Sequence, residues 1–485
     1  MTSALADALL QARTHPAALH RIRERIALTT EAARRAGGYL AGAPHRPISP
    51  TPEAVAALDA FRVPLQHAPR PAREVLAQLD EIGSPATVVQ GAGRYFGYVN
   101  GGVEPAAAAA AILAGAWDQN VALPGMSPTA SVLDEVAAGW IVDLLGLPPT
   151  AVATFTTGAT LANFTAIVTA RDALLARAGW DVNERGLIGA PALRVVVGDE
   201  VHASALKSLR MAGLGAGAVE RVAVDASGAI DAASFPTDTD ALTLVLLQAG
   251  NVTTGASDPF ASIIPGVRER GGWVHVDGAF GLWAAASPAR RHLVAGVELA
   301  DSWATDAHKW LNAPYDSGVV TVRDQADLHR AMSIDAPYLA TDHARPLMHL
   351  SPHMSQRARG VETWALLAAR GRDGVAALVD DACMRADQFA TALRAAGVEV
   401  LAEPVLNQVP VAFGPSPGLP GDDQITDAVI ARIQADGTMW AGASTWRGRR
   451  ILRLSVSDAA TTADDVDAAV VALLTTWGSV LAQRA

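Results

Sequence analysis

From about residue 86 to residue 340, short apolar or β-branched runs alternate with amphipathic stretches of helical period. No other feature limits the fold as strongly, because strands that alternate with helices predict a mostly parallel sheet covered on both faces. The candidate strands are residues 151–156, 194–198, 219–224, 243–248, 273–276, 302–305 and 318–322. The candidate helices are residues 127–145, 160–178, 203–212, 259–270 and 325–332. Ligands bind such sheets at the carboxyl ends of the strands.

The flanking residues indicate two further parts of the chain. Before about residue 85 the pattern predicts three helices, at 16–42, 51–65 and 72–82. After about residue 340, two helices at 357–370 and 374–396 lead into a smaller α/β pattern. We therefore predict a helical N-terminal arm at 1–88 that embraces a second subunit, a large domain at 89–345 and a small C-terminal α/β domain at 346–485.

Charge and composition argue against several classes of protein. The net charge of −11 and the pI near 5.5 argue against nucleic acid as a main partner. A single cysteine, Cys383, rules out an intrachain disulfide and fits a reducing compartment. The longest apolar run, residues 106–117, is far shorter than the roughly 20 residues of a membrane span, and the N-terminal pattern is not that of a signal peptide. We therefore expect a cytoplasmic protein with no membrane or nucleic-acid partner.

The segment 306–309, which reads Asp-Ala-His-Lys, directly follows the candidate strand 302–305. The chain has 38 lysines and arginines, but only two of them, Lys207 and Lys309, are lysines. An arginine-rich chain meets most needs for surface charge without lysine, whereas only a lysine amine forms a Schiff base with an aldehyde. Lys309 is therefore either one more solvated charge or, as its neighbours favour, an amine that the chemistry requires.

A second candidate site segment, residues 156–163 (T-T-G-A-T-L-A-N), follows a candidate strand and opens a helix. A small glycine-containing turn at this place leaves backbone N–H groups free, and the helix dipole favours an anion. Thr157 and Thr160 can add hydroxyl donors. The segment is either an ordinary capped helix start or a phosphate-binding turn, and it is not a Walker A loop because no lysine follows.

Two more polar residues follow candidate strands. Asp277 comes directly after the apolar run 273–276, and a carboxylate at this place can hold a proton on a pyridine nitrogen. That proton makes a pyridinium an electron sink, which is the chemistry of pyridoxal phosphate. His202 follows the strand 194–198, where an imidazole can stack on an aromatic ring. Taken alone, Asp277 could instead cap the next turn, and a lone histidine such as His202 is more often structural.

The order and separation of Thr160, His202, Asp277 and Lys309 resemble the group II pyridoxal-phosphate-dependent decarboxylases. That family includes aromatic amino acid, histidine and glutamate decarboxylases on the type I, aspartate-aminotransferase fold. The resemblance covers residues 90 to 480, and its most specific part is the block from Asp306 to Trp310. Further matching motifs are Tyr95-Phe96-Gly97, Ser127-Pro128, Val201-His202, Gly250-Asn251-Val252, His275 to Ala279, Ser355-Gln356-Arg357 and Leu452-Arg453.

The resemblance implies pyridoxal 5'-phosphate as the cofactor and a role for each matching residue. Lys309 would carry the cofactor as an internal aldimine that leads to a quinonoid intermediate. Asp277 would pair with the pyridine nitrogen, while Ala279 packs under the ring and His202 stacks over it. The residues implied for the phosphate are Ala159, Thr160 and His308, and Asn251 is implied for the hydroxyl side of the ring.

The same resemblance implies a substrate pocket shared by two subunits of a homodimer. Tyr95, Phe96 and Asn100 match a segment that lines the substrate pocket in the family. Arg453 matches the arginine that binds a carboxylate in related aminotransferases, although it could also be a surface or interface arginine. Because the matching segment is apolar and aromatic, we expect a neutral or aromatic L-amino acid as the substrate.

The chain departs from the family pattern in two places. The phosphate turn has Leu161 where an acidic residue is usual, and the lid at about residues 340–354 lacks the tyrosine that protonates the substrate carbon in many family members. The lid contains His343, His349 and His353, and a histidine such as His349 or His353 could be the general acid. The lid histidines could also be merely solvated, and the missing tyrosine could direct the reaction to an aldehyde, to transamination or to aldolase-type chemistry.

Overall fold

The computed structural model describes residues 16–334 and 345–484. Its largest sheet has seven strands in the order β2-β8-β7-β6-β5-β3-β4. The strands are β2 (Val152–Thr156), β3 (Arg194–Gly198), β4 (Glu220–Val222), β5 (Thr243–Gln248), β6 (Trp273–Asp277), β7 (Ser302–Asp306) and β8 (Gly318–Val322). Neighbouring strands run parallel, except that β8 is antiparallel to both β2 and β7. The predicted seven-stranded, mostly parallel sheet is confirmed.

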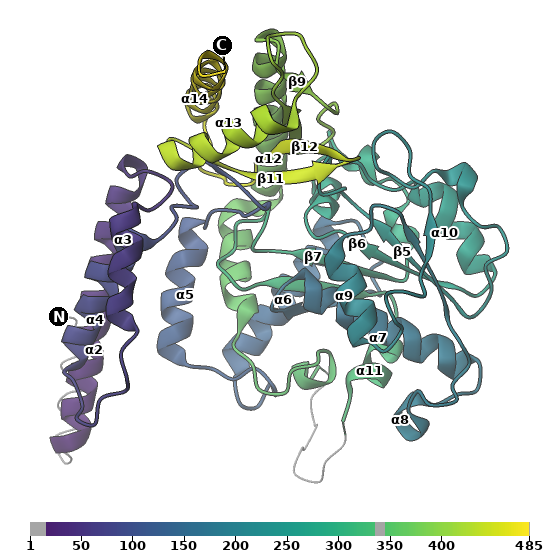
Figure 1. The fold of residues 1–485 in the computed structure, drawn as a ribbon. Coiled ribbons are helices and arrows are strands. Elements are labelled where there is room, and N and C mark those ends of the chain that lie inside the picture. Colours follow the sequence, from purple (N-terminus) through teal and green to yellow (C-terminus); the bar gives the residue numbers. More distant parts are fainter. Residues whose placement is uncertain (1–15, 335–344, 485) are drawn as a thin grey trace.

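Helices cover both faces of this sheet (Figure 1) because alternate strand residues point to opposite sides. In β3, for example, Val195 and Val197 belong to one apolar core, whereas Val196 belongs to the other. The first core includes residues of α7 (Ala159–Arg177), α9 (Ala203–Met211) and α11 (Gln325–Met332). The second core includes residues of α6 (Pro128–Leu144) and α10 (Phe260–Glu269). The short helix α8 (Val182–Arg185) follows α7.

A second sheet has five strands in the order β1-β11-β12-β10-β9. The strands are β1 (Tyr95–Phe96), β9 (Glu399–Val400), β10 (Gln408–Ala412), β11 (Trp440–Trp446) and β12 (Arg449–Ser455). It packs with α13 (Asp423–Asp436) and α14 (Ala463–Ala482). The hairpin between β11 and β12 turns at Arg447 and Gly448, whose positive φ values of 51° and 75° suit a tight two-residue turn. β1 lies in the range predicted for the large domain but pairs with β11, so the boundaries at 88 and 345 stay predictions.

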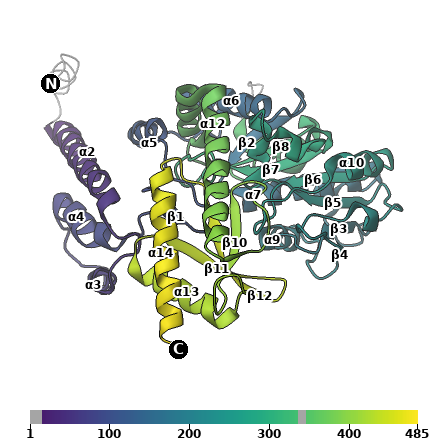
Figure 2. The ribbon, with the colours of Figure 1, turned by 90° about the horizontal axis from the view of Figure 1, so that it is seen from above.

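The two helices predicted at 357–370 and 374–396 form one element, α12 (Arg359–Ala395), with a break between them. The break is at Gly371, whose φ of 62° is in the left-handed region that glycine tolerates. α12 contacts α5 (Pro105–Trp117) and α6 as well as α14 and β10, so it joins the two sheets. Figure 2 shows α12 running between the two parts of the molecule.

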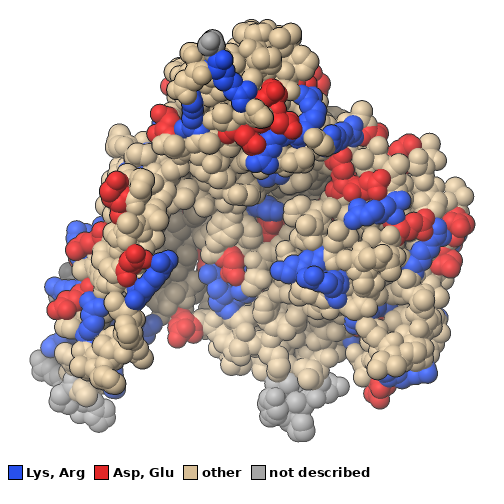
Figure 3. All heavy atoms as spheres, viewed as in Figure 1, with Lys and Arg blue, Asp and Glu red and all other residues tan. Residues whose placement is uncertain are grey.

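The N-terminal arm contains α2 (Pro16–Gly42), α3 (Pro52–Ala57) and α4 (Ala72–Gln78). It stands at one side of the molecule, beside α5 (Figures 1 and 2), and the guanidinium of Arg25 donates to the Ala116 carbonyl at 3.0 Å. In Figure 3 a recess separates the arm from the body, and positive and negative side chains are mixed over this face. The predicted helix at 51–65 is shorter, since a 3₁₀ turn at Leu58–Phe61 ends it.

Within residues 16–334 and 345–484, one helix is long and apolar enough to cross a membrane by length and composition alone. This helix is α14, and core helices of soluble proteins pass the same test. Its residues Val466, Leu473 and Trp477 are buried in the core of the small sheet, where the Trp477 ring lies 5.8 Å from that of Phe413. The expectation that no membrane is involved stays a prediction.

Candidate active site

Lys309 lies three residues beyond Asp306, the last residue of β7. Its amine nitrogen Nζ is 3.1 Å from Oδ2 of Asp306, which is buried. The other carboxylate oxygen of Asp306 accepts the backbone N–H of Ala159 at 2.6 Å and lies 3.5 Å from Nε2 of His308. One carboxylate therefore bridges the lysine and the first turn of α7.

The predicted phosphate turn between β2 and α7 lies directly against this segment. Gly158 begins the turn with a φ of 150°, and a Cβ on it would come within 3.1 Å of the His308 ring, so the position favours glycine. The His308 ring is fixed from both sides, because Nδ1 accepts the Ser317 N–H at 3.0 Å and the ring stacks on Tyr315 at 4.3 Å. Burial lowers the pKa of His308. The turn that carries Ala159 and Thr160 thus meets His308, as the sequence predicts.

Asp277 ends β6, and its carboxylate is held by a chain of hydrogen bonds. Oδ1 accepts the Ala279 N–H at 3.2 Å, and Oδ2 accepts the side-chain amide of Asn163 at 2.8 Å. The amide oxygen of Asn163 is 2.9 Å from Nε2 of His275, and Nδ1 of His275 is 3.0 Å from the Ser302 hydroxyl. Burial lowers the pKa of His275 to about 4, so its ring is neutral at pH 7. With the amide oriented in this way, Nε2 of His275 donates to Asn163, and Asn163 in turn donates to Asp277.

A cavity of about 330 Å³ lies between the carboxyl edge of the large sheet, at Asp277 and Lys309, and Arg453 of the small sheet. The predicted residues that line it are His202, Asp277, Ala279, Lys309 and Arg453. They come from the end of β6, from the loops after β3, β6 and β7, and from β12, so residues of both sheets form the cavity. Tyr98, Val99, Gln248, Gly250, Val252 and Phe280 complete the wall.

His202 caps α9, since its Nδ1 accepts the Ser204 N–H at 3.2 Å. Its backbone N–H donates to the side chain of Gln248 at 2.9 Å, which joins the loop after β3 to the end of β5. Burial lowers the pKa of His202, and the nearby cations Lys309 and Arg453 lower it further, whereas Asp277 opposes the shift. A neutral imidazole at this wall is suited to stacking on a flat ring in the cavity.

Arg453 points into the cavity from β12, and one of its guanidinium nitrogens donates to the Val252 carbonyl at 3.0 Å. Burial lowers its pKa. Among the described residues, no carboxylate lies within ion-pair distance of this guanidinium. A partly buried cation that no described carboxylate neutralises is suited to binding an anion.

The residues of the predicted substrate segment that line the cavity are not the ones predicted. The described residues that line the cavity do not include Tyr95, Phe96 or Asn100. Tyr95 stacks on Trp440 at 5.0 Å, Phe96 is buried in the core, and Asn100 accepts a hydrogen bond from Tyr315 at 2.9 Å.

Tyr98 and Val99, from the same segment, line the wall instead, and both have left-handed φ values, 54° and 61°. Left-handed non-glycine residues are uncommon, so nothing in the sequence indicated this turn of the chain.

The remaining predicted residues lie away from the cavity wall. Asn251 is buried behind it, where its amide donates to Glu200 at 2.8 Å and its oxygen accepts the Thr253 N–H at 2.8 Å. His349 is buried beside the ring of His329, at 5.4 Å. The described lining of the cavity includes neither His349 nor His353, and burial lowers the pKa of His353. His343 lies outside the described residues.

Asn163 and His275 were not predicted as partners of Asp277. A signal for His275 was present, because residues two apart on a strand point to the same face, and His275 precedes Asp277 by two. Asn163 closes the phosphate-turn segment one helical turn after Thr160, which places it on the face of α7 that meets β6.

The arrangement fits one cofactor class. A lysine amine, a carboxylate supported for a pyridinium and a neutral imidazole line one cavity at the carboxyl edge of the large sheet, and Asp306 links the lysine to the N-terminus of α7. These features define a pyridoxal-phosphate-dependent enzyme. The chain belongs to the pyridoxal-dependent decarboxylase family, whose conserved-domain model matches residues 60–413.

Individual relatives agree with this family. The chain is 29% identical over 268 residues to the L-tyrosine/L-DOPA decarboxylase 2 of Lophophora williamsii, covering 51% of this chain and 50% of that one. It is 30% identical over 320 residues to the L-2,4-diaminobutyrate decarboxylase of Rhizobium meliloti, covering 63% and 62%. The matches thus span about half to three fifths of these relatives. The Oryza sativa TDC structure with PLP and tryptamine has a TM-score of 0.85 and 22% identity over 93% of this chain and 97% of that chain, which confirms the type I fold.

Proposed function

We propose that this chain is a pyridoxal-phosphate-dependent decarboxylase of a neutral or aromatic L-amino acid. The observation that carries the proposal is that Lys309, Asp277 and Arg453 line one cavity. The first is the amine that bonds to the cofactor aldehyde, the second holds the proton on the pyridine nitrogen, and the third binds the substrate carboxylate. Each of these groups is supplied by a different strand end or strand.

The cofactor, when bound, withdraws electrons from the bond to the departing carboxylate. His202 presents a neutral ring to one side of the cavity, and Ala279 offers a small side chain at its wall. The backbone N–H of Ala159 and the ring of His308, both now beside Asp306, would hold the phosphate together with Thr160 of the same turn. Asp306 has to give up its hydrogen bond to Ala159 when a phosphate binds there.

The substrate preference rests on the cavity wall. Tyr98, Phe280 and Val252 offer apolar and aromatic surface, and the charged side chains among the described lining residues are those of Asp277, Lys309 and Arg453. Each of these three charges has a role with the cofactor or the carboxylate. No further carboxylate at this wall is positioned to bind a cationic substrate side chain, which favours a neutral or aromatic one.

We propose a homodimer in which α5 is covered by the partner subunit. The 13 residues of α5 include no charged side chain, yet Ala107 is the one member that is buried in the single chain. Ile112, Leu113 and Trp117 are exposed on it, as is Leu40 on the arm beside it. Apolar patches of this kind mark interfaces. Light scattering should give the mass of two chains, and Leu113→Glu should shift the mass toward one chain.

The absorbance spectrum tests the cofactor part of the proposal. The purified protein should be yellow, and Lys309→Ala should lose the visible band. Lys207→Ala is the matched control, because Lys207 is exposed on α9, and it should keep the band. No band in the wild-type protein after addition of pyridoxal phosphate would refute the proposal.

The products test the reaction. The loaded enzyme is incubated with a panel of amino acids while carbon dioxide, amine, aldehyde and keto acid are followed. We expect carbon dioxide and amine in equal amounts from a neutral or aromatic amino acid. Aldehyde in place of amine, or keto acid without carbon dioxide, would assign the chain to another pyridoxal-phosphate reaction.

The general acid is proposed to be His349 or His353. If either ring protonates the substrate carbon, it has to reach a cavity that it does not line in the single chain. His349→Phe or His353→Phe should slow turnover and leave the visible band unchanged. Tyr338→Phe is the comparison variant, because Tyr338 is the tyrosine nearest to this stretch in the sequence. Unchanged turnover in both histidine variants removes them from the mechanism.

A further inference from the structure

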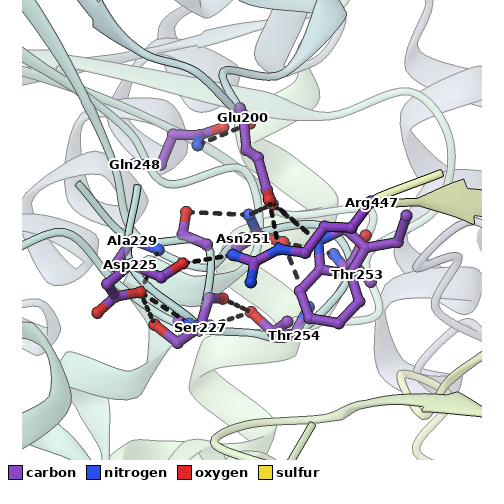
Figure 4. A network of polar contacts seen from close by, with 12 residues as sticks. Glu200, Asp225, Ser227, Ala229, Gln248, Asn251, Thr253, Thr254 and Arg447 are labelled. Carbon is purple, nitrogen blue, oxygen red and sulfur yellow. Dashed lines mark hydrogen bonds and ion pairs between the residues drawn. The ribbon is translucent and has the colours of Figure 1, made fainter. Parts of the chain in front are cut away.

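Glu200 lies in the loop after β3, two residues before His202, and its carboxylate is the centre of a polar network (Figure 4). Its oxygen Oε2 accepts the side-chain amide of Asn251 at 2.8 Å. Both oxygens lie 3.1 Å from the indole nitrogen of Trp446, and Oε1 is 3.5 Å from Nε of Arg447. These donors come from the loop after β5 and from the end of β11.

The same residue is tied to the wall of the cavity that His202 forms. The backbone carbonyl of Glu200 accepts the side-chain N–H of Gln248 at 3.1 Å, and the oxygen of that side chain accepts the His202 N–H. Gly228 packs directly against the network, because a Cβ on it would come within 2.6 Å of both Glu200 and Asn251. The Glu200 carboxylate is therefore held in a defined place relative to His202.

On the other side the network holds the tip of the β11–β12 hairpin. Trp446 is buried, Arg447 stacks on it at 4.7 Å, and Arg447 also donates to the Asp225 carbonyl. The hairpin returns through β12, where Arg453 projects into the cavity. Two residues that line the cavity, His202 in the loop after β3 and Arg453 in β12, are thus both connected to Glu200.

We propose that Glu200 is a positioning residue that sets the place of Arg453 relative to the rest of the substrate site. The inference rests on the proposed function, because Arg453 is there the group that binds the substrate carboxylate. Without the carboxylate of Glu200, the hairpin tip and the Asn251 side chain lose their charge-assisted hydrogen bonds. The loop whose Val252 carbonyl accepts from Arg453 is then held less firmly, and so is the Arg453 guanidinium. Residues that contact the cofactor keep their own supports, since Asp277 is held by Asn163 and Lys309 by Asp306.

The expected signature is a loss of affinity that is limited to ligands with a carboxylate. Glu200→Ala should raise KM for the amino acid by about tenfold, as loss of a hydrogen bond to a charged group does, and change kcat by less than about threefold. The amine product lacks the carboxylate, so its inhibition constant should not change. The visible band and the affinity for pyridoxal phosphate should also stay as in the wild type.

Glu399→Ala is the matched control. Glu399 accepts a bidentate ion pair from Arg449, at 2.6 and 2.7 Å. Arg449 belongs to the β11–β12 hairpin and lies outside the described lining of the cavity. This variant should lower stability without changing KM. Equal rises of KM in the two variants, or weaker binding of amine and amino acid alike after Glu200→Ala, would show that Glu200 is merely structural.

Two further variants keep the test decisive if Glu200→Ala does not fold. Trp446→Phe removes one donor to Glu200, and Glu200→Gln keeps the shape of the side chain without its charge; each should raise KM by a smaller factor in the same selective way. Should no amino acid be decarboxylated, the proposed function fails, and titration of the visible band with amino acids and with amines still measures the selectivity that Glu200 controls. Absence of that selectivity in the titration would overturn the inference by itself.

Discussion

Asp277 and Asp306 end two neighbouring parallel strands, β6 and β7, and both carboxylates are buried at the same edge of the sheet. Each accepts one backbone N–H from a nearby turn. Their other partners differ. Asp277 accepts from the neutral amide of Asn163, whereas Asp306 lies 3.1 Å from the ammonium of Lys309.

The two carboxylates therefore differ in whether their charge is already paired within the protein. The charge of Asp277 has no cationic partner among the described side chains within hydrogen-bond distance, so it is kept for a cation in the cavity. The charge of Asp306 is already matched, by Lys309 and by the positive end of α7. In the proposed function the two aspartates therefore have different roles: Asp277 is the counter-ion for the cofactor ring, and Asp306 occupies the helix N-terminus where the cofactor phosphate would bind.

The largest expected effect comes from neutralising the first of the pair. Asp277→Asn should lower kcat by about 10³-fold, because an amide cannot hold the proton on the pyridine nitrogen by a charge-assisted bond. The variant should still bind the cofactor through Lys309. The measurement is kcat at matched cofactor content, and Asp277→Glu, which keeps the charge, is the control. A variant with more than about a tenth of the wild-type rate would contradict the role of Asp277.

The second-largest expected effect is on stability at low pH, and it comes from His275, which is linked to Asp277 through Asn163. The pKa of buried His275 falls from 6.5 to about 4 in the folded protein, so folding keeps the ring neutral. Below pH 6.5 the histidine of the unfolded chain takes up a proton that the folded protein excludes. The free energy of unfolding is therefore unaffected by His275 above pH 6.5 and decreases as the pH falls toward 4. The decrease amounts to at most about 3 kcal/mol of unfolding free energy.

Denaturant unfolding at pH 7.5 and at pH 5, at one protein concentration, tests this expectation. The wild type should lose more stability between the two pH values than His275→Asn loses. Equal losses would mean that another group causes the acid sensitivity.

The smallest expected effect comes from neutralising Asp306, and it is a gain in binding affinity where the other variants lose activity or stability. In Asp306→Asn the side chain no longer repels a phosphate at the Ala159 N–H, so the affinity of the apoprotein for pyridoxal phosphate and for inorganic phosphate should rise by about tenfold. Fluorescence titration of the apoprotein measures both constants. Asp277→Asn is the control and should leave the phosphate constant unchanged. A lower phosphate affinity in Asp306→Asn would break the comparison between the two aspartates.

Local pattern was sufficient to predict the edge of the sheet where the site lies. Asp277 and the segment 306–309 each follow an apolar run directly, and parallel strands bring such positions together. The strand and helix order followed from the same periodicity, and even the break in α12 was predicted between residues 370 and 374, where Gly371 interrupts the helix.

The parts that could not be predicted depend on long-range packing or on unusual backbone. The pairing of Glu200 with Trp446 joins residues that are 246 positions apart and requires the hairpin to fold over the other sheet. Tyr98 replaces Tyr95 at the cavity wall because two successive residues adopt left-handed conformations, which side-chain pattern does not reveal. Asp306 was visible in the motif, but only the distance to Ala159 shows that it fills the helix N-terminus.

The scarcity of lysine gives this chain a built-in chemical reporter. Lys207 is exposed on α9, whereas Lys309 is paired with Asp306. An amine-directed reagent followed by mass spectrometry therefore has two side-chain targets, of which one serves as an internal standard for the other. The ratio of the two labelled peptides would measure how many molecules hold the cofactor in a sample, without a substrate and without knowledge of the reaction.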